Sequence, residues 1–124
     1  MTRVFAMIMA LGLAAAGAAV AQQEATETGT GATLRGLDKL TGKVTDIQLA
    51  SGDSTQFGRI EIALGECRYP EGDRAGDAFA FVHVQNLGAE TPVFSGWMIA
   101  SSPALSALEH PRYDVWVTRC TTSS

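Results

Sequence analysis

The sequence predicts an all-β domain, a small antiparallel sandwich or barrel of about five to seven strands with one short helix before the last strand. Apolar and polar residues alternate along several short segments, which is the spacing of half-buried strands. Clusters of Gly, Asp, Asn and Pro separate these segments, as turns between antiparallel strands require. With 124 residues, the chain fits one domain better than two.

The alternating segments define the expected strands in order. They cover residues 44–49, 59–64, 77–85, 93–100 and 113–120. In the clearest of them, Ile60, Ile62 and Leu64 fall on one face, and polar or small residues fall between them. Gly65 then interrupts the alternation before Cys67, which predicts a β-bulge or a bend at this point.

The segment between residues 101 and 110 has the features of a short helix. Two serines stand where helix caps are favoured, and Pro103 follows them at the first helical position. Leu105 and Leu108 are spaced to share one helix face. His110 precedes a proline, which disfavours helical backbone at His110 and ends the helix there.

Residues 1–21 have the features of a secretory signal peptide. Arg3 gives a positive start, residues 4–20 are apolar and rich in Ala and Gly, and residues 19–21 (AVA) match a small-x-small cleavage site. Retention of this segment as a membrane anchor is the alternative, although Ala and Gly contribute little to membrane insertion. We therefore expect a periplasmic or secreted protein.

A polar segment follows the signal and leads into the domain. Residues 22–33 contain no large apolar side chain, so we expect a disordered leader there. A single β-rich domain is expected over residues 34–120, with a tail at residues 121–124. After signal cleavage no run is long and apolar enough to form a transmembrane span. The net charge of −4 gives no support for nucleic-acid binding.

Cys67 and Cys120 are the only cysteines, and both follow the signal. In an oxidising compartment such a pair predicts a disulfide. On chain-entropy grounds, closing so long a loop would stabilise the fold by about 4 kcal/mol. A redox or zinc role fits less well, because the C-x-x-C spacing is absent and the two histidines are distant.

The polar residues that catalysis usually recruits are few in this chain. Ser101, Ser102 and His110 form the candidate polar site, and Asp114 completes a Ser/His/Asp set on paper. No nucleophile-elbow pattern surrounds the serines, so helix capping is the preferred interpretation of these residues. We therefore predict no catalytic residue, no metal site and no cofactor.

Both tryptophans lie near the C-terminal end of the chain, among other large side chains. Together they define a candidate interaction surface of Phe94, Trp97, Met98, Tyr113 and Trp116. Aromatic residues and Met anchor many protein interfaces, but the same residues would also serve as the core of a small domain. In either case we expect Trp97 and Trp116 to lie close together, with the helix folded over the sheet edge nearby.

Four motifs carry a resemblance to a known family. They are RGLDKLTGKV at residues 35–44, the strand that ends at Cys67, FSGWMIASSPALSALEHP at residues 94–111, and YDVWV-x-x-C at residues 113–120. Over residues 34–120 the chain resembles a bacterial family of small exported proteins, domain of unknown function 2155. The resemblance implies an exported envelope protein and assigns no catalytic or ligand-binding residue. Family genes often lie near one for an accessory subunit of respiratory NADH dehydrogenase, which implies a membrane complex as partner.

The sequence leaves two functions open. The first is a non-catalytic periplasmic interaction module whose partner is an envelope protein or a respiratory membrane complex. The second is a small-ligand-binding protein or hydrolase-like enzyme with a pocket near Ser101, Ser102 and His110. A deep cleft of convergent polar groups would favour the second function, and a flat aromatic patch would favour the first.

Overall fold

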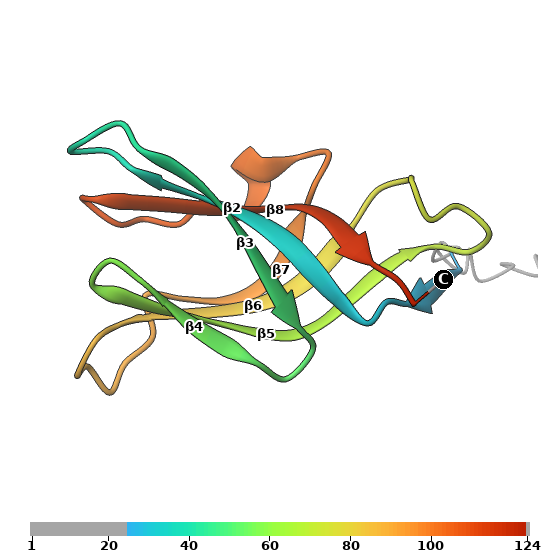
Figure 1. Ribbon diagram of the computed structural model, residues 1–124, viewed down its shortest axis with the longest axis horizontal. Coiled ribbons are helices and arrows are strands. Elements are labelled where there is room, and N and C mark those ends of the chain that lie inside the picture. The colour runs from blue at the N-terminus through green and yellow to red at the C-terminus, as the bar shows by residue number, and fades with distance from the viewer. Residues whose placement is uncertain (1–24, 124) are drawn as a thin grey trace, which may run out of the picture.

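The computed structural model describes residues 25–123, which form two antiparallel sheets packed face to face (Figure 1). The elements are β1 (Thr26–Thr28), β2 (Gly31–Asp38), β3 (Val44–Ala50), β4 (Ser54–Phe57), β5 (Ile60–Pro70), β6 (Phe79–Asn86), β7 (Phe94–Ile99), η1 (Pro103–Ser106) and β8 (Tyr113–Thr121). The all-β sandwich is therefore confirmed, although these residues contain eight strands where fewer were expected.

The larger sheet is built around the long strand β5. Its strand order is β1-β5-β6-β7, and β4 pairs with the first part of β5 while β1 pairs with the last part. The register between β5 and β6 shifts between Leu64 and Cys67, so the bulge expected at Gly65 is confirmed. The smaller sheet has the order β3-β2-β8.

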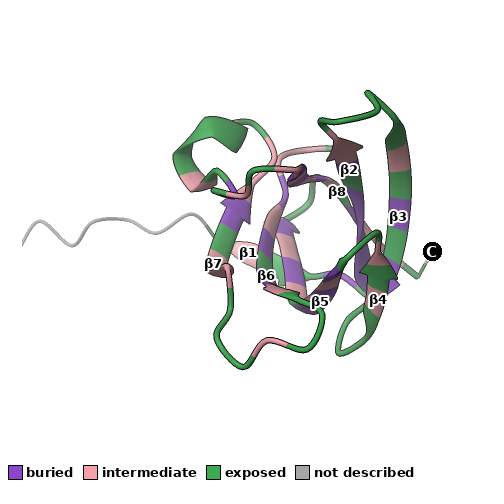
Figure 2. Ribbon diagram, turned by 90° about the vertical axis from the view of Figure 1, so that its left-hand side faces the viewer, coloured by how far each residue is buried: buried purple, intermediate pink, exposed green. Residues whose placement is uncertain are grey.

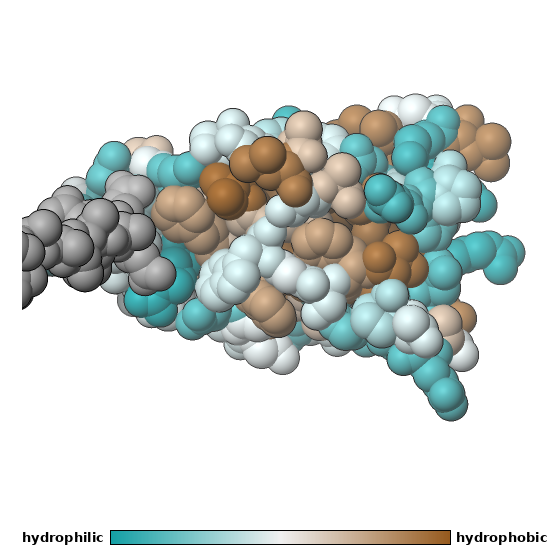
Figure 3. Space-filling view, turned by 180° about the vertical axis from the view of Figure 1, so that it is seen from behind, coloured by the Kyte–Doolittle hydropathy of each residue, from teal (hydrophilic) through white to brown (hydrophobic). Residues whose placement is uncertain are grey.

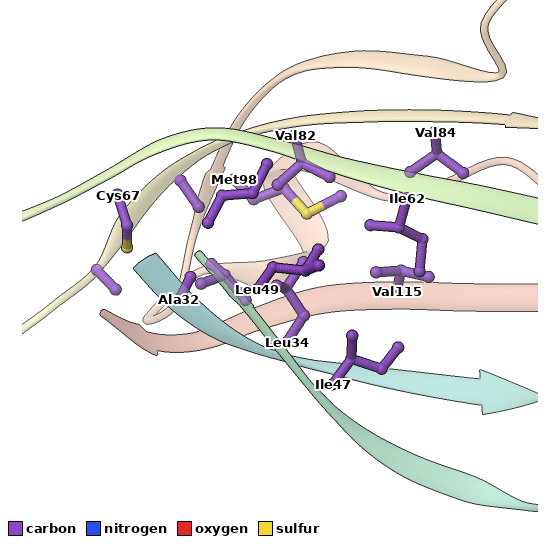
Figure 4. Packing of buried hydrophobic residues seen from close by; sticks show 14 of the residues in the cluster. Ala32, Leu34, Ile47, Leu49, Ile62, Cys67, Val82, Val84, Met98 and Val115 are labelled. Atoms are coloured by element: carbon purple, nitrogen blue, oxygen red, sulfur yellow. The ribbon is translucent and has the colours of Figure 1, made fainter. Parts of the chain in front are cut away.

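The core lies between the two sheets. Inward-facing side chains such as Leu34, Ile62, Met98 and Val115 converge there (Figure 4) and are 2% exposed or less. Buried positions alternate with more exposed ones along β3, β5, β6 and β8, as Figure 2 shows, whereas the first four residues of β2 are all buried. Full burial of one such side chain stabilises the fold by about 1.5–3 kcal/mol, so this interlayer packing supplies most of the driving force.

The disulfide joins the two sheets. Cys67 on β5 and Cys120 on β8 are bonded, with a Cα–Cα distance of 5.6 Å, and both are buried. This distance lies inside the range of about 4.4–6.8 Å typical of disulfides. The predicted pairing is therefore confirmed.

The prediction of a short α-helix before the last strand is wrong. Pro103–Ser106 forms one 3-10 turn, closed by a hydrogen bond from the Leu105 N–H to the Ser102 carbonyl at 3.0 Å, and no side chain caps it. Leu105 is 75% exposed and Leu108 is 4% exposed, so the two leucines do not share a buried face. Without a continuous apolar stripe, nothing favours a longer α-helix here.

The prediction of a disordered leader over residues 22–33 is also wrong where the structure describes it. Residues 22–24 and the expected signal peptide lie outside the described residues, but residues 26–28 form β1 and β2 begins at Gly31. Backbone pairing with β5 and β3 holds this segment in place. The strands approach closely at Gly31, where a Cβ would lie 2.2 Å from the Leu49 carbonyl oxygen. Small residues therefore permit close strand contact where burial of large side chains is absent.

Among residues 25–123, no helix has the length and apolar character needed to cross a membrane.

Candidate functional site

The five residues expected to form one aromatic surface are divided between core and surface. Met98 and Tyr113 are each 2% exposed, and Phe94 packs partly buried against the core. Trp97 is 43% exposed, and Trp116 is partly exposed. Met98 and Tyr113 face inward because each occupies a core-facing position of its strand, so they are excluded from any interaction surface.

Trp97 pairs with an aromatic residue that the sequence analysis did not select. Phe81 on β6 lies directly across from Trp97 on β7, and the ring centroids are 5.4 Å apart in an edge-to-face arrangement. Phe81 is 36% exposed, so both rings contribute to the outer face of the larger sheet. Edge-to-face pairs of this kind hold both rings in a defined orientation.

The neighbouring strand leaves the Phe81 ring uncovered on its β5 side. Gly65 of the bulge lies beside it, and a Cβ at Gly65 would be 3.2 Å from the Phe81 ring. Figure 3 shows hydrophobic side chains gathered over the side of the molecule that carries β7 and η1. We call Phe81 and Trp97 the aromatic pair.

The backbone of Trp97 is partly shielded by the turn η1. The Ser106 hydroxyl donates a hydrogen bond of 2.7 Å to the Trp97 carbonyl, and the Ser102 N–H donates one of 3.1 Å to the Ile99 carbonyl. These bonds occupy carbonyls on the free edge of β7, where another chain could otherwise add a strand. The turn therefore lies over the sheet edge, as expected, and leaves the aromatic side chains available.

Trp116 faces away from Trp97. Val115 and Val117 of β8 point into the core, so Trp116 projects from the outer face of the smaller sheet, while Trp97 projects from the outer face of the larger one. The expectation that the two tryptophans lie close together is therefore wrong. The alternation of side chains along each strand places them on opposite faces of the sandwich.

Trp116 lines a groove beside η1. The groove has a volume of about 410 Å³ and is lined by Pro103, Ala104, Ala107, Asp114 and Trp116. Its side chains are apolar except for the Asp114 carboxylate and the indole N–H of Trp116. Trp116 was an expected surface residue, but nothing in the sequence connects it with Asp114 or with the alanines around the turn.

The candidate polar residues are separated by the length of β6. The Ser101 hydroxyl donates to Asp77 Oδ2 at 2.6 Å, just before β6 begins, while His110 Nε2 contacts Asn86 Oδ1 at 2.8 Å, where β6 ends. At about 3.3 Å per residue, the two ends of this strand segment are roughly 30 Å apart. Ser101 and His110 therefore cannot act on one substrate atom.

His110 has structural partners on both ring nitrogens. Its Nδ1 accepts the N–H groups of Arg112 at 3.0 Å and Tyr113 at 3.2 Å, so Nε2 carries the proton and donates to Asn86. Burial, with a contribution from the positive charge of Lys39, holds the pKa of His110 below its ordinary value. A neutral imidazole with both nitrogens occupied is suited to holding loops together rather than to proton transfer.

An ion pair lies beside this histidine. Arg112 Nη2 lies 3.1 Å from Asp38 Oδ2, and the hydrogen bond from this guanidinium holds the pKa of the Asp38 carboxyl below its ordinary value. Lys39 Nζ donates to the His110 carbonyl at 2.7 Å. The RGLDKLTGKV motif thus contacts the loop before β8 through Asp38 and Lys39, and its Arg35 pairs with Asp46.

No metal-ligand group occurs in the described part of the chain, where no three His, Cys, Asp or Glu side chains come together. The surface of the described residues carries the aromatic pair on one face and the groove beside Trp116 on the other.

Comparisons with known proteins agree with the motifs. The model of the family described as "Uncharacterized protein conserved in bacteria (DUF2155)" matches residues 32–120. An uncharacterized protein of Rickettsia prowazekii (strain Madrid E) is 31% identical over 87 residues, which is 68% of this chain. The match spans 56% of that relative, so about half of its length is covered. No solved structure matches the chain.

Proposed function

The chain belongs to the bacterial family DUF2155, and because the family description names no activity, we propose a function from the surface of this domain. The protein is an exported, periplasmic interaction module that performs no chemistry and binds another envelope protein. The class of partner that we propose is a membrane complex, such as a respiratory one, which is the partner that the family resemblance implies.

The aromatic pair is the observation that carries the proposal. Aromatic side chains dominate the binding energy of many protein interfaces, especially where they lie together in a fixed orientation. Here Phe81 and Trp97 hold each other in place, and both remain more than a third exposed. A small domain gains little stability from leaving two large rings in water, which favours a role in binding.

Two features support the expected location. The N-terminal sequence has the pattern of an export signal. The Cys67–Cys120 disulfide is of a kind that forms and persists in oxidising compartments such as the bacterial periplasm. Both features favour a module that works outside the cytoplasm.

The alternative function, a ligand-binding or hydrolase-like pocket near Ser101, Ser102 and His110, gains no support from the geometry. Ser101 is bonded to Asp77, and His110 is bonded to Asn86 at the far end of β6. Ser102 makes no side-chain cap and contributes its backbone N–H to the Ile99 carbonyl. These residues stabilise loops, and no polar cleft brings them together.

Site-specific crosslinking tests the proposal in the native envelope. A photoreactive phenylalanine analogue is placed at position 97, at position 81 or, as a control, at exposed Gln48 on the opposite sheet. We expect one adduct of the same mass from positions 81 and 97 and none from position 48. Adducts that are equal at all three positions, or absent from 81 and 97, would contradict the proposal.

A substitution separates binding from folding at the same position. Trp97→Ala removes a ring that is 43% exposed, so it should lower the free energy of unfolding by no more than about 1 kcal/mol. The same substitution should abolish the adduct formed from position 81. Urea unfolding of the purified variant measures the first effect. A loss of several kcal/mol would instead show that Trp97 serves the fold.

A further inference from the structure

We propose that the groove between η1 and the outer face of β8, which we call the Trp116 groove, binds an extended segment of a partner protein through an arginine or lysine side chain. The proposal rests on the interaction role proposed above, but it concerns the opposite face of the sandwich and a different chemistry. Its occupant is defined by three properties of the groove: its shape, its charge and the identity of its aromatic wall.

The shape of the groove suits one or two side chains of an extended segment. Its volume of about 410 Å³ is too small for a whole protein interface but falls within the usual size of ligand pockets. Trp116 forms the β8 side, and Pro103, Ala104 and Ala107 form the η1 side. Short side chains on η1 keep the groove open, because none of them reaches across to the indole.

The Asp114 carboxylate in the groove favours a positively charged ligand. Asp114 lies two residues before Trp116, on the same outward side of β8, and is partly buried. The ion pairs among the described residues are Arg35–Asp46, Arg68–Glu66 and Arg112–Asp38, and none of them includes Asp114. The groove therefore holds a carboxylate that forms no ion pair among the described residues.

Two basic residues flank this part of β8, one across the strand pair and one just before the strand, and both are engaged elsewhere. Arg35 is the cross-strand neighbour of Trp116, but its Nε bonds Asp46 Oδ1 at 2.9 Å on the far side of β2. Arg112 precedes β8 and is held by both carboxylate oxygens of Asp38. With these two residues engaged, we expect a partner to supply the basic side chain for Asp114, and the net charge of −4 further favours a basic partner.

The aromatic wall strengthens the selection of a cation. A guanidinium or ammonium group stacks favourably on the face of a tryptophan, and Trp is the best of the aromatic residues for this contact. The indole also carries an N–H that donates to a backbone carbonyl of an extended segment. Trp116 and Asp114 together thus offer stacking, a counter-charge and a backbone contact to one basic residue.

Nuclear magnetic resonance with defined peptides tests this proposal. The probe is the blocked pentapeptide Ala-Pro-Arg-Pro-Ala, and the control peptide carries citrulline, which has the shape of arginine without its charge. The protein is the ¹⁵N-labelled chain purified from the periplasm. We expect saturable shifts of the Trp116 indole resonance and of the Ala104 and Ala107 amides, with about tenfold weaker binding of the citrulline peptide.

Two variants test whether the charge of Asp114 selects the arginine peptide. Asp114→Asn should weaken binding of the arginine peptide about tenfold and remove the preference over citrulline. Asp53→Asn, which changes an exposed acid in the turn before β4, should leave both peptides unaffected. Thermal unfolding of both variants checks that the fold is retained. If Asp114→Asn unfolds the chain, Asp114→Glu, which keeps the charge, must bind the arginine peptide in preference to citrulline.

Three results would overturn the proposal. The first is the absence of shifts at the Trp116 indole up to about 10 mM peptide, where even weak binding registers. The second is equal binding of the arginine and citrulline peptides. The third is a shift of the same resonances with protein concentration alone, which would identify a second copy of the chain as the occupant. The outcome is independent of crosslinking at position 97, so the two proposals can fail separately.

Discussion

The two ends of the sandwich are held together by different chemistry. At one end, which we call the disulfide end, Cys67 of β5 and Cys120 of β8 join the sheets covalently. At the other, which we call the tyrosine end, Tyr113 at the start of β8 and His110 before it join them through hydrogen bonds and ring contacts. Figure 1 shows how β8 runs from one end to the other.

The tyrosine end depends on a close fit around one buried ring. The Arg59 N–H donates to the Tyr113 hydroxyl at 3.1 Å, and the Phe57 ring lies 5.4 Å from the Tyr113 ring. Gly58 adopts a φ of +58°, and a Cβ there would lie 2.3 Å from the same hydroxyl. This contrast predicts how the free energy of unfolding depends on each end. At the disulfide end it should decrease when the crosslink is removed. At the tyrosine end it should depend on the packing around Tyr113 and on pH.

The largest expected effect is at the disulfide end. Replacing Cys67 and Cys120 together by alanine should lower the free energy of unfolding by about 4 kcal/mol, because the unfolded chain gains the freedom that the crosslink removed. Urea unfolding should also show a larger m-value, because a longer free chain exposes more surface. A loss below about 1 kcal/mol would show that the crosslink contributes little beyond strand packing.

The next effect is at the tyrosine end. Tyr113→Phe keeps the ring but removes the acceptor of the Arg59 N–H, so we expect a loss of about 1–2 kcal/mol. Tyr69→Phe is the matched control, because Tyr69 is also buried but lies near the disulfide end. Denaturant unfolding of both variants measures the difference. Equal losses would contradict a special role for the Tyr113 hydroxyl.

The disulfide end was the more predictable of the two. Two cysteines in a chain that is expected to be exported have few alternatives, and the alternation of Ile60, Ile62 and Leu64 indicated which face of β5 is buried. The first argument needs only the number of cysteines and the expected compartment, although the two residues are 53 positions apart, and the second needs only the local alternation. The strand β1 was missed because it is held by backbone pairing with β5, which requires no apolar side chains.

The tyrosine end and the aromatic pair depend on contacts between distant residues. Tyr113 meets the Arg59 N–H across 54 positions of the chain, and Phe81 meets Trp97 only through the register of β6 and β7. The alternation of Ala80, Val82 and Val84 was a usable signal, because it places the small residues inward and leaves Phe81 outward. Without strand order, however, no partner for Phe81 could be identified.

The smallest expected effect is a pH dependence confined to the tyrosine end. The folded state holds the pKa of His110 below its ordinary value of 6.5, because the ring is partly desolvated and Lys39 lies nearby. The unfolded chain therefore takes up a proton first as the pH falls. The free energy of unfolding should be constant above about pH 7 and decrease below about pH 6.5, until the folded state is protonated as well.

Two variants test whether the His110 ring causes this pH dependence. His110→Asn offers an acceptor oxygen to the Arg112 and Tyr113 N–H groups but does not titrate, so the decrease between about pH 7 and pH 5 should disappear. His83→Asn, in the middle of β6, should keep it. Denaturant unfolding at a series of pH values provides the measurement. Persistence of the full decrease in His110→Asn would place the responsible group elsewhere, and the tyrosine end would then differ from the disulfide end in packing alone.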